Sequence, residues 1–330
     1  MSQTDSSEQP PGRRPQDEAL RKLLEQTRFA PGEVSARLES ALSEGFWLKL
    51  CPDLSLGKSS PNSALEVEAL NAPGRDALVR KFEHEGYFQT APLFSQTTVG
   101  RMAQCVEALR RADWPPVFAF VYDEFWEVTR GAALSGLLSA TLGEGYRQLP
   151  HIWSHYVHQL RGAGWRPHVD GYRKVKRATV WIALSDATLS NGCIYLIPRN
   201  MAPGEVAREF PRLESLGIED VGALLHGSRA LPARAGAVLG WGHDVIHWGA
   251  SCGPAEAPRI SISQEFVSGG EQRAVDKTPL LDARRLPTFA ARLHVIATAV
   301  VAYQKFEPLN VRYLELAERL LERTAVSWFF

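Results

Sequence analysis

The sequence predicts a mainly β fold with flanking helices, an α+β protein whose core is a double-stranded β-helix, or jelly roll. Two observations support this prediction. Apolar residues recur with a helical period up to about residue 150 and again from residue 289, whereas between these regions they alternate. The alternating region holds short strands that are separated by turns, without long helices between them. That pattern is typical of two packed antiparallel sheets.

The 330-residue chain divides into four regions by composition and period. Residues 1–16 are polar, charged and proline-containing, and predict a disordered tail. Residues 17–74 form an N-terminal helical segment, and residues 75–275 form the β core, with an insertion at 202–230. Residues 276–330 return to a helical period and predict a C-terminal helical buttress.

The expected helices have apolar residues three or four apart, which places those residues on one face for packing. They cover Asp17–Phe29, Val34–Leu50, Arg75–Glu85, Val99–Arg111, Phe289–Tyr303 and Val311–Arg323, with one or two short turns inside the insertion. The C-terminal helices buttress a sheet in the simplest interpretation. The alternative is a homodimer surface, with Trp328–Phe330 as a contact.

The expected strands combine β-branched and aromatic residues with bounding turns. They begin at Gly86–Thr90 and continue with Val117–Tyr122, Ile152–Leu160, Ala178–Leu184, Cys193–Ile197, Ala235–Gly240, Val245–Gly249 and Arg259–Val267. In Ile152–Leu160, odd-numbered and even-numbered side chains point to opposite faces, and one of these faces should line a pocket. His151 and His155 would lie ~13 Å apart along such a strand, which argues against a shared metal ion.

Charge and composition exclude several classes of function. Lys+Arg and Asp+Glu both number 37, so the net charge is zero, which argues against nucleic-acid or anionic-membrane binding. The four cysteines form no Cys-x-x-Cys pair, which argues against a zinc site or a disulfide framework. The N-terminus lacks a signal-peptide pattern, and the most apolar run, Val295–Tyr303, is far shorter than the ~20 residues of a membrane span. We therefore expect a soluble, cytoplasmic protein.

The strongest functional pattern is His168-Val169-Asp170 followed by His247. In an extended segment, residues i and i+2 point the same way, so His168 and Asp170 can reach one point. Two histidines and one carboxylate with open coordination positions make the facial triad of non-haem Fe(II) oxygenases. His243, four residues before His247, competes for the third ligand position.

Arg259 lies twelve residues after His247. This spacing allows one strand to end at the metal ligand and the next to return with an arginine beside it. A guanidinium is a planar fork that suits a carboxylate. A 2-oxoglutarate cosubstrate needs two coordination sites on iron and one cation for its distal carboxylate, and Arg259 could supply that cation.

The order of motifs over residues 80–268 resembles the phytanoyl-CoA dioxygenase family of Fe(II)/2-oxoglutarate oxygenases. After His-x-Asp come Trp181-Ile-Ala-Leu-Ser-Asp186, Asn191-Gly-Cys-Ile-Tyr-Leu-Ile-Pro198, Gly236-Ala-Val-Leu-Gly-Trp241 and Pro258-Arg259. The resemblance implies iron ligation by His168, Asp170 and His247. It also implies that Arg259 binds the 2-oxoglutarate carboxylate, assisted by Ser261, and that Trp181 lines the cosubstrate site. The family pattern places the ligand after Val245-Ile246, which favours His247 over His243.

One departure from the family is visible, because Pro198-Arg199-Asn200 stands where the family often has Pro-Gly-Ser/Thr-His. The resemblance implies Fe(II), 2-oxoglutarate and O2 as cofactor and cosubstrates. It implies hydroxylation or another oxidation of an unactivated C–H bond in a small metabolite, with succinate and CO2 as coproducts. Related halogenases have Gly or Ala in place of the carboxylate, so Asp170 favours hydroxylation over halogenation.

Two alternatives remain open from the sequence. One is a cupin-like metal enzyme that uses no 2-oxoglutarate, and the other is a non-catalytic jelly-roll binding protein. The candidate substrate pocket is a mixture of aromatic and polar side chains, which does not distinguish an acyl chain from a polar or aromatic metabolite. Its residues are Trp153, His155, Tyr156, Trp165 and Tyr172. Basic residues between Arg161 and Arg177 form either a solvated rim or a landing site for a phosphate- or carboxylate-bearing substrate.

Overall fold

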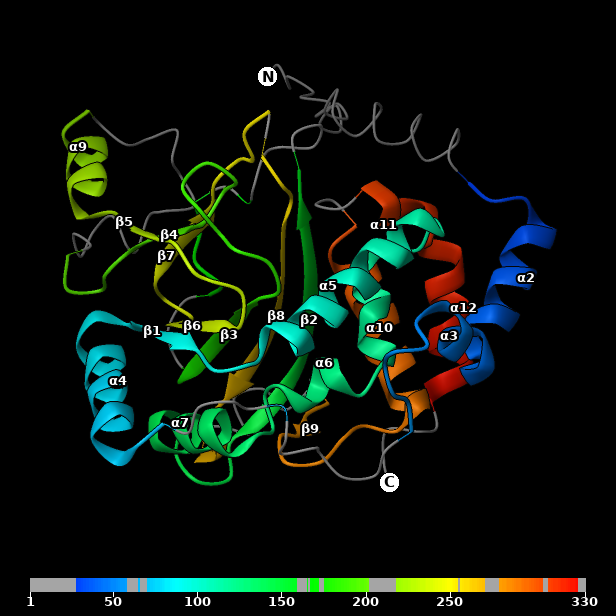
Figure 1. Ribbon diagram of the computed structural model, residues 1–330, viewed down its shortest axis with the longest axis horizontal. Helices are drawn as coiled ribbons and strands as arrows, with labels where there is room; N and C mark the ends of the chain where they lie inside the picture. The colour runs from blue at the N-terminus through cyan, green and yellow to red at the C-terminus, as the bar shows by residue number, and fades with distance from the viewer. Residues whose placement is uncertain are drawn as a thin grey trace, which may run out of the picture.

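The fold was determined as a computed structural model (Figure 1). It describes residues 28–57, 65, 70–158, 165, 167–171, 175–201, 218–254, 256–270, 279–304 and 308–325. The expected tail at 1–16, most of the expected helix at 17–29 and the aromatic end Trp328–Phe330 lie outside these ranges. The proposed dimer contact at that end therefore stays a prediction.

Two antiparallel sheets form the β core, as the sequence predicts. The six-stranded sheet has the order β1-β6-β3-β8-β2-β9, and the three-stranded sheet has the order β5-β4-β7. The strands are β1 Tyr87–Pro92, β2 Arg147–Val157, β3 Arg177–Ala183, β4 Ile194–Ile197, β5 Arg229–Leu231, β6 Ala237–Gly242, β7 Ile246–Gly249, β8 Arg259–Val267 and β9 Leu281–Asp282. The short strands β5 and β9 are not among the sequence predictions, and β9 extends the larger sheet beyond residue 275.

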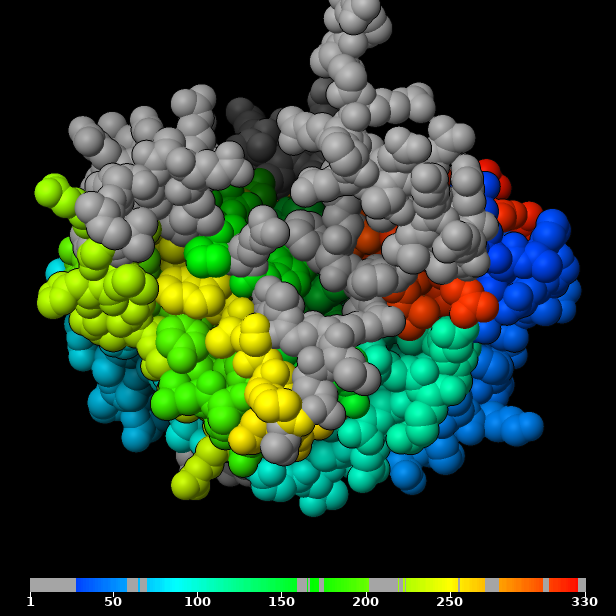
Figure 2. Space-filling view, turned by 90° about the horizontal axis from the view of Figure 1, so that it is seen from above, coloured from blue at the N-terminus to red at the C-terminus, as the bar shows by residue number. Residues whose placement is uncertain are grey.

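Helices surround this core. They are α2 Pro31–Leu42, α3 Glu44–Leu50, α4 Ala72–Glu85, α5 Gln96–Arg111, α6 Glu124–Glu127, α7 Ala132–Leu142, α9 Ile218–Gly227, α10 Phe289–Ala302, α11 Pro308–Arg312 and α12 Leu314–Thr324. The N- and C-terminal helices lie together on one side of the large sheet (Figure 1), where α12 contacts α2 and α10 contacts β2. In Figure 2 these helices (blue, orange and red) occupy one end of the molecule, with α9 (yellow-green) at the other.

Side chains along the central strand β3 point alternately toward the helices and toward the small sheet, so they pack in two separate layers. On β3, Val180 and Ile182 join the large cluster that packs against the helices. Trp181 and Ala183 point the other way and pack with Leu196 of the small sheet. Because successive strand residues face opposite sides, the even-numbered residues of β3 build the helix-facing core and the odd-numbered ones face the space between the sheets.

The prediction of a strand at Val117–Tyr122 is wrong. The segment forms a 3₁₀ helix, η2 Pro116–Val121, with Pro116 in its first turn and every residue buried. It contacts α5, α10 and β2, so apolar partners surround it on several sides. A short apolar run with such surroundings has no polar face, and periodicity cannot separate strand from helix there.

Two predicted helices are each split in two. Ser43 interrupts the segment predicted at 34–50, because its side chain accepts a hydrogen bond from the Phe46 amide and caps α3. Tyr313 lies between α11 and α12 in the segment predicted at 311–323. None of the helices in the described ranges is both long and apolar enough to cross a membrane.

Candidate metal centre

His168 and His247 are brought together by the backbone. The two residues form an antiparallel bridge, in which each amide donates to the other's carbonyl at 3.0 and 2.9 Å. His247 belongs to β7, so the segment of His168 lies along the edge of the small sheet. Directly opposed residues place their side chains on the same face, and the two imidazole rings lie 4.3 Å apart between centroids.

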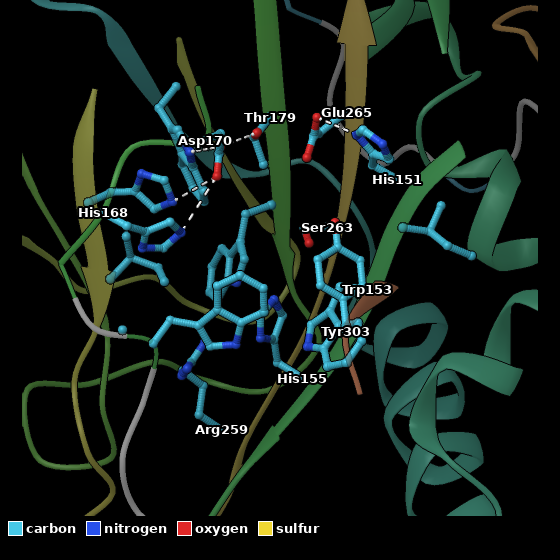
Figure 3. Close-up of a pocket in the computed structure, with 17 residues that line it drawn as sticks. His151, Trp153, His155, His168, Asp170, Thr179, Arg259, Ser263, Glu265 and Tyr303 are labelled. Atoms are coloured by element: carbon cyan, nitrogen blue, oxygen red, sulfur yellow. Dashed lines mark hydrogen bonds and ion pairs between the residues drawn. The ribbon is translucent and has the colours of Figure 1, made fainter. Parts of the chain in front are cut away.

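Asp170 completes the cluster. Its Oδ1 lies 3.6 Å from Nε2 of His168 and 3.5 Å from Nε2 of His247. Its Oδ2 accepts hydrogen bonds from the Thr179 hydroxyl at 2.6 Å and from the Trp241 indole at 3.0 Å. One carboxylate oxygen is thus held by neighbouring strands, while the other is presented to the two histidines (Figure 3).

The donor set suits a divalent metal ion. One ligand atom from each of His168, Asp170 and His247 can be chosen so that all lie within 4.8 Å of one another. His247 Nδ1 lies 3.0 Å from the Val245 carbonyl oxygen. A hydrogen bond there makes Nδ1 the donor and leaves Nε2 with its lone pair for a metal. Two imidazoles and a carboxylate match the facial set that holds Fe(II).

The protonation states agree with this donor set. Burial lowers the pKa of His247 to about 4, so its imidazole is neutral and able to ligate. Burial alone would raise the pKa of Asp170, but the neighbouring His247 and His168 side chains and the hydrogen bond from Thr179 lower it well below the usual value. A neutral imidazole and an ionised carboxylate are the forms that bind metal.

Arg259 is buried at the start of β8, with 1% of its surface exposed. Its Nη1 donates to Ser261 Oγ at 3.2 Å, and its Nε has no hydrogen-bond partner among the residues that the structure describes. Within the described ranges no carboxylate lies at ion-pair distance from it. Burial lowers the pKa of Arg259 to about 10, which leaves the guanidinium charged at neutral pH. A buried charge without a counter-ion is costly.

A cavity joins the three-residue cluster to Arg259. Of the residues predicted from the sequence, the cavity is lined by the three metal-ligand candidates and by Arg259, Trp181, Trp153, His155 and Trp165. Ser261 is fully buried beneath Arg259. Tyr172 lies outside the described residues.

Tyr156 does not line this cavity, contrary to the prediction for it. It follows His155 on β2 and therefore faces the opposite side of the sheet. Its ring lies under the Arg110 guanidinium, 4.1 Å from ring centroid to Cζ, and packs against the helix-facing core. The other face of β2, with His151, Trp153 and His155, is the one that lines the cavity.

Other cavity residues are absent from the sequence prediction. They are His151, Ile152, Thr179, Ile194, Trp241, Gly249, Ser263, Glu265 and Tyr303. Thr179 could have been found by alternation from Trp181, and Ser263 and Glu265 by alternation from Arg259. Tyr303 follows α10 and reaches the cavity only through tertiary packing, for which the sequence carries no signal.

His243 is not part of the metal cluster. Its Nε2 lies 3.9 Å from Glu265 Oε2, and its ring packs so closely over Gly171 that a Cβ there would lie 2.2 Å from His243 Cε1. The departure from the family pattern at Arg199 is structural, because Arg199 donates two hydrogen bonds of 2.8 Å to the Asp244 carboxylate.

Comparisons with known proteins give only distant likenesses. No family model matches the chain, and no curated protein matches it at a significant level. Among solved structures, the non-haem α-ketoglutarate-dependent epimerase SnoN from nogalamycin biosynthesis is 14% identical, with a TM-score of 0.49, over 60% of this chain and 82% of that chain. The carbocyclase SnoK from the same biosynthesis is 17% identical, with a TM-score of 0.48, over 67% and 99%.

A third solved structure, the non-haem monooxygenase ThoJ in complex with nickel, is 16% identical, with a TM-score of 0.46, over 69% of this chain and 97% of that chain. Scores and identities this low support no inference about ligand or reaction. The chemistry of the site must therefore be argued from the residues of this chain.

Proposed function

We propose that the protein is an Fe(II)- and 2-oxoglutarate-dependent oxygenase that hydroxylates, or otherwise oxidises, an unactivated C–H bond of a small metabolite. The observation that carries the proposal is one cavity that combines the His168–Asp170–His247 cluster with the buried, unpaired guanidinium of Arg259. For hydroxylation the balance is substrate C–H plus O2 plus 2-oxoglutarate giving substrate C–OH plus succinate plus CO2.

Each residue has a defined task in this proposal. His168, Asp170 and His247 would hold the metal, and the keto acid and O2 would bind to it beside them. Bound iron would supply the activation of O2 and the oxidising power, coupled to decarboxylation of the keto acid. Arg259 pairs with the distal carboxylate of 2-oxoglutarate. Trp181, whose ring centroid lies 5.8 Å from Arg259 Cζ, forms a wall beside that pair.

The surroundings of the cluster favour oxidation by hydroxylation over halogenation. A halide would need a coordination position freed by loss of the carboxylate, and Asp170 keeps that position filled. Its Oδ2 is fixed by Thr179 and Trp241, so the carboxylate cannot easily turn away from the metal.

The test is succinate formation from 2-oxoglutarate by the protein loaded with Fe(II) without oxygen and then exposed to O2. Wild type should produce succinate even without the prime substrate, by uncoupled turnover. His168→Ala and Arg259→Ala should produce little, because one removes a metal ligand and the other removes the counter-ion. Arg319→Ala, at an exposed arginine on α12, is the matched control and should behave as wild type.

Binding measurements separate the alternatives. Calorimetric titration of 2-oxoglutarate into anaerobic Fe(II)-loaded protein should show binding that Arg259→Ala abolishes and His168→Ala weakens. Tight Fe(II) binding without any 2-oxoglutarate binding would contradict the proposal and favour a cupin-like metal enzyme. Failure to bind any divalent metal would contradict it in favour of a non-catalytic binding protein.

A further inference from the structure

The cavity has a second polar end, opposite Arg259. Residues 259, 261, 263 and 265 of β8 lie on the same face, because successive strand residues alternate sides. Arg259 and Glu265 are therefore about 20 Å apart along the strand. Both line the cavity, and Figure 3 shows them at its two ends, with Ser263 between them. A cation marks one end and a carboxylate the other.

Glu265 lies beside the metal cluster. It is the direct cross-strand partner of Thr179, whose hydroxyl holds Asp170. Glu265 Oε2 makes a contact of 2.9 Å with Nδ1 of His151. Its other oxygen, Oε1, has no hydrogen-bond partner in the described part of the chain, although the side chain is only 14% exposed. One acceptor atom therefore faces the cavity without a partner.

The charges around Glu265 are already balanced. Burial lowers the pKa of His151, but the hydrogen bond and charge of Glu265 outweigh this and raise the pKa above the usual value, so the pair tends toward an ion pair. Arg177 is near enough to influence both His151 and His243. Asp170 is the other carboxylate at this end, and it would face the metal. This end of the cavity therefore needs neither a further cation nor a further anion to balance its charge.

Aromatic rings form the wall between the two ends. The ring centroids of Trp153 and Tyr303 lie 4.7 Å apart, and those of Trp165 and Tyr303 lie 5.7 Å apart. Burial and the charges of Glu265 and Asp170 raise the pKa of Tyr303, so its hydroxyl stays protonated. The wall offers a broad apolar surface with a hydroxyl at its edge.

We infer that the Glu265 end of the cavity binds a neutral hydroxyl group of the substrate, whose ring or apolar body packs against Trp153 and Tyr303. A hydroxyl can donate to Glu265 Oε1 and accept from Ser263 or Tyr303. This inference rests on the proposed function in one respect, since it assigns the Arg259 end to 2-oxoglutarate and the remaining end to the substrate. The bond that is oxidised would then lie close to the bound hydroxyl.

Three probes with one ring and different polar groups test this inference: cyclohexylmethanol, cyclohexylmethylamine and cyclohexanecarboxylate. Binding is measured by tryptophan fluorescence with wild-type protein, both metal-free and loaded with Zn(II) and 2-oxoglutarate. The alcohol should bind at least several-fold more tightly than the amine or the carboxylate. Tighter binding of the amine, or equal binding of all three, would overturn the inference.

Variants of Glu265 test the residue itself. Glu265→Leu should weaken binding of the alcohol about tenfold, because it removes a charged hydrogen-bond acceptor. Glu265→Gln retains an acceptor oxygen, so its affinity for the alcohol should fall much less. Glu39→Leu, at an exposed acidic residue on α2, is the matched control and should leave binding unchanged. Thermal melting and Zn(II) affinity check that each variant is folded.

The outcomes distinguish this inference from the proposed function. If Zn(II) and 2-oxoglutarate bind but Glu265→Leu leaves the alcohol's affinity unchanged, the inference is wrong and the oxygenase proposal stands. If neither Zn(II) nor 2-oxoglutarate binds, but the protein still binds the alcohol more tightly than the amine and the carboxylate and this difference depends on Glu265, the oxygenase proposal is wrong and the hydroxyl site stands.

Discussion

The hydroxyl of Thr179 donates a hydrogen bond of 2.6 Å to Oδ2 of Asp170, the oxygen that faces away from the two histidines. Thr179 lies in the middle of β3, which is paired on both sides, so its backbone is fixed by the large sheet. The metal cluster itself lies on a loop and on β7 of the small sheet. This hydrogen bond therefore links a loop ligand to a strand that is paired on both sides.

Thr179→Val should weaken Co(II) and Fe(II) binding about 10- to 100-fold, the usual effect of losing a group that orients a ligand. The valine keeps the shape of the side chain, so the melting temperature should change little. Thr179→Ser keeps the hydroxyl and should retain most of the affinity. Spectroscopic titration with Co(II) measures both variants. Equal affinity in Thr179→Val and wild type would show that Trp241 alone holds Asp170.

Arg259→Met should separate stability from cosubstrate binding. It replaces a buried charge that lacks a counter-ion with an apolar side chain of similar length. The metal-free variant should therefore be at least as stable as wild type, with a gain on the order of 1 kcal/mol in the free energy of unfolding. Chemical denaturation measures this difference.

The same variant has a second readout. 2-Oxoglutarate with Zn(II) should raise the melting temperature of wild type, because a ligand that binds only the folded state stabilises it. For Arg259→Met, adding 2-oxoglutarate should not raise the melting temperature beyond the value reached with Zn(II) alone. A marked destabilisation of the metal-free variant would show that Arg259 has a structural role.

Much of the site could be predicted from the sequence because its signals are local. His168 and Asp170 are two residues apart, and a strand geometry suffices to bring their side chains together. Arg259 begins a strand whose predicted bounds, Arg259–Val267, agree with β8. The two-sheet core follows from the alternating pattern, and the division of side chains between helix-facing and cavity-facing layers follows from the same alternation.

The rest depends on contacts between distant segments. Tyr303 reaches the cavity from the end of α10, and Glu265 matters because it stands opposite Thr179 across a strand pair. No local pattern distinguishes Tyr303 from an ordinary core residue. Alternation from Arg259 places Glu265 on the cavity face, but it does not reveal the contact of Glu265 with His151. The residue type of Tyr156 predicts a place in the pocket, whereas its position on β2 turns it toward Arg110. The buried run 116–121 gave no period at all.

Asp123 and Arg292 form an ion pair of 2.6 Å between groups that are 0% and 1% exposed. It joins the segment after η2 to α10. Asp123→Ala leaves a buried guanidinium without its partner, so it should lower the free energy of unfolding by about 3–5 kcal/mol. Glu315→Ala breaks an exposed pair of 2.7 Å with Arg319 on α12 and should cost ~0.5 kcal/mol or less.

Urea denaturation of the metal-free protein compares these two variants. Replacing both buried partners by Leu and Met should recover most of the loss from Asp123→Ala, because no charge is then left buried. Equal effects of Asp123→Ala and Glu315→Ala would contradict the distinction between buried and exposed pairs.

The pair of His151 and Glu265 predicts a pH dependence of stability. Glu265 raises the pKa of His151 in the folded protein above its ordinary value, against the opposing effects of burial and of Arg177. The folded state then binds the proton more tightly than the unfolded state. The pair's contribution to stability is present in full below the ordinary pKa of ~6.5 and is lost as the pH rises through the folded value.

Wild type and His151→Gln should therefore differ most in free energy of unfolding at mildly acidic pH, and the difference should shrink as the medium becomes alkaline. Denaturation in the presence of a chelator measures this difference at each pH. Groups that titrate equally in both proteins make no contribution to this difference in free energy of unfolding. A difference that grew with rising pH would show that His151 is held neutral in the folded state, and that Glu265 contacts it as a plain hydrogen-bond acceptor instead of as an ion-pair partner.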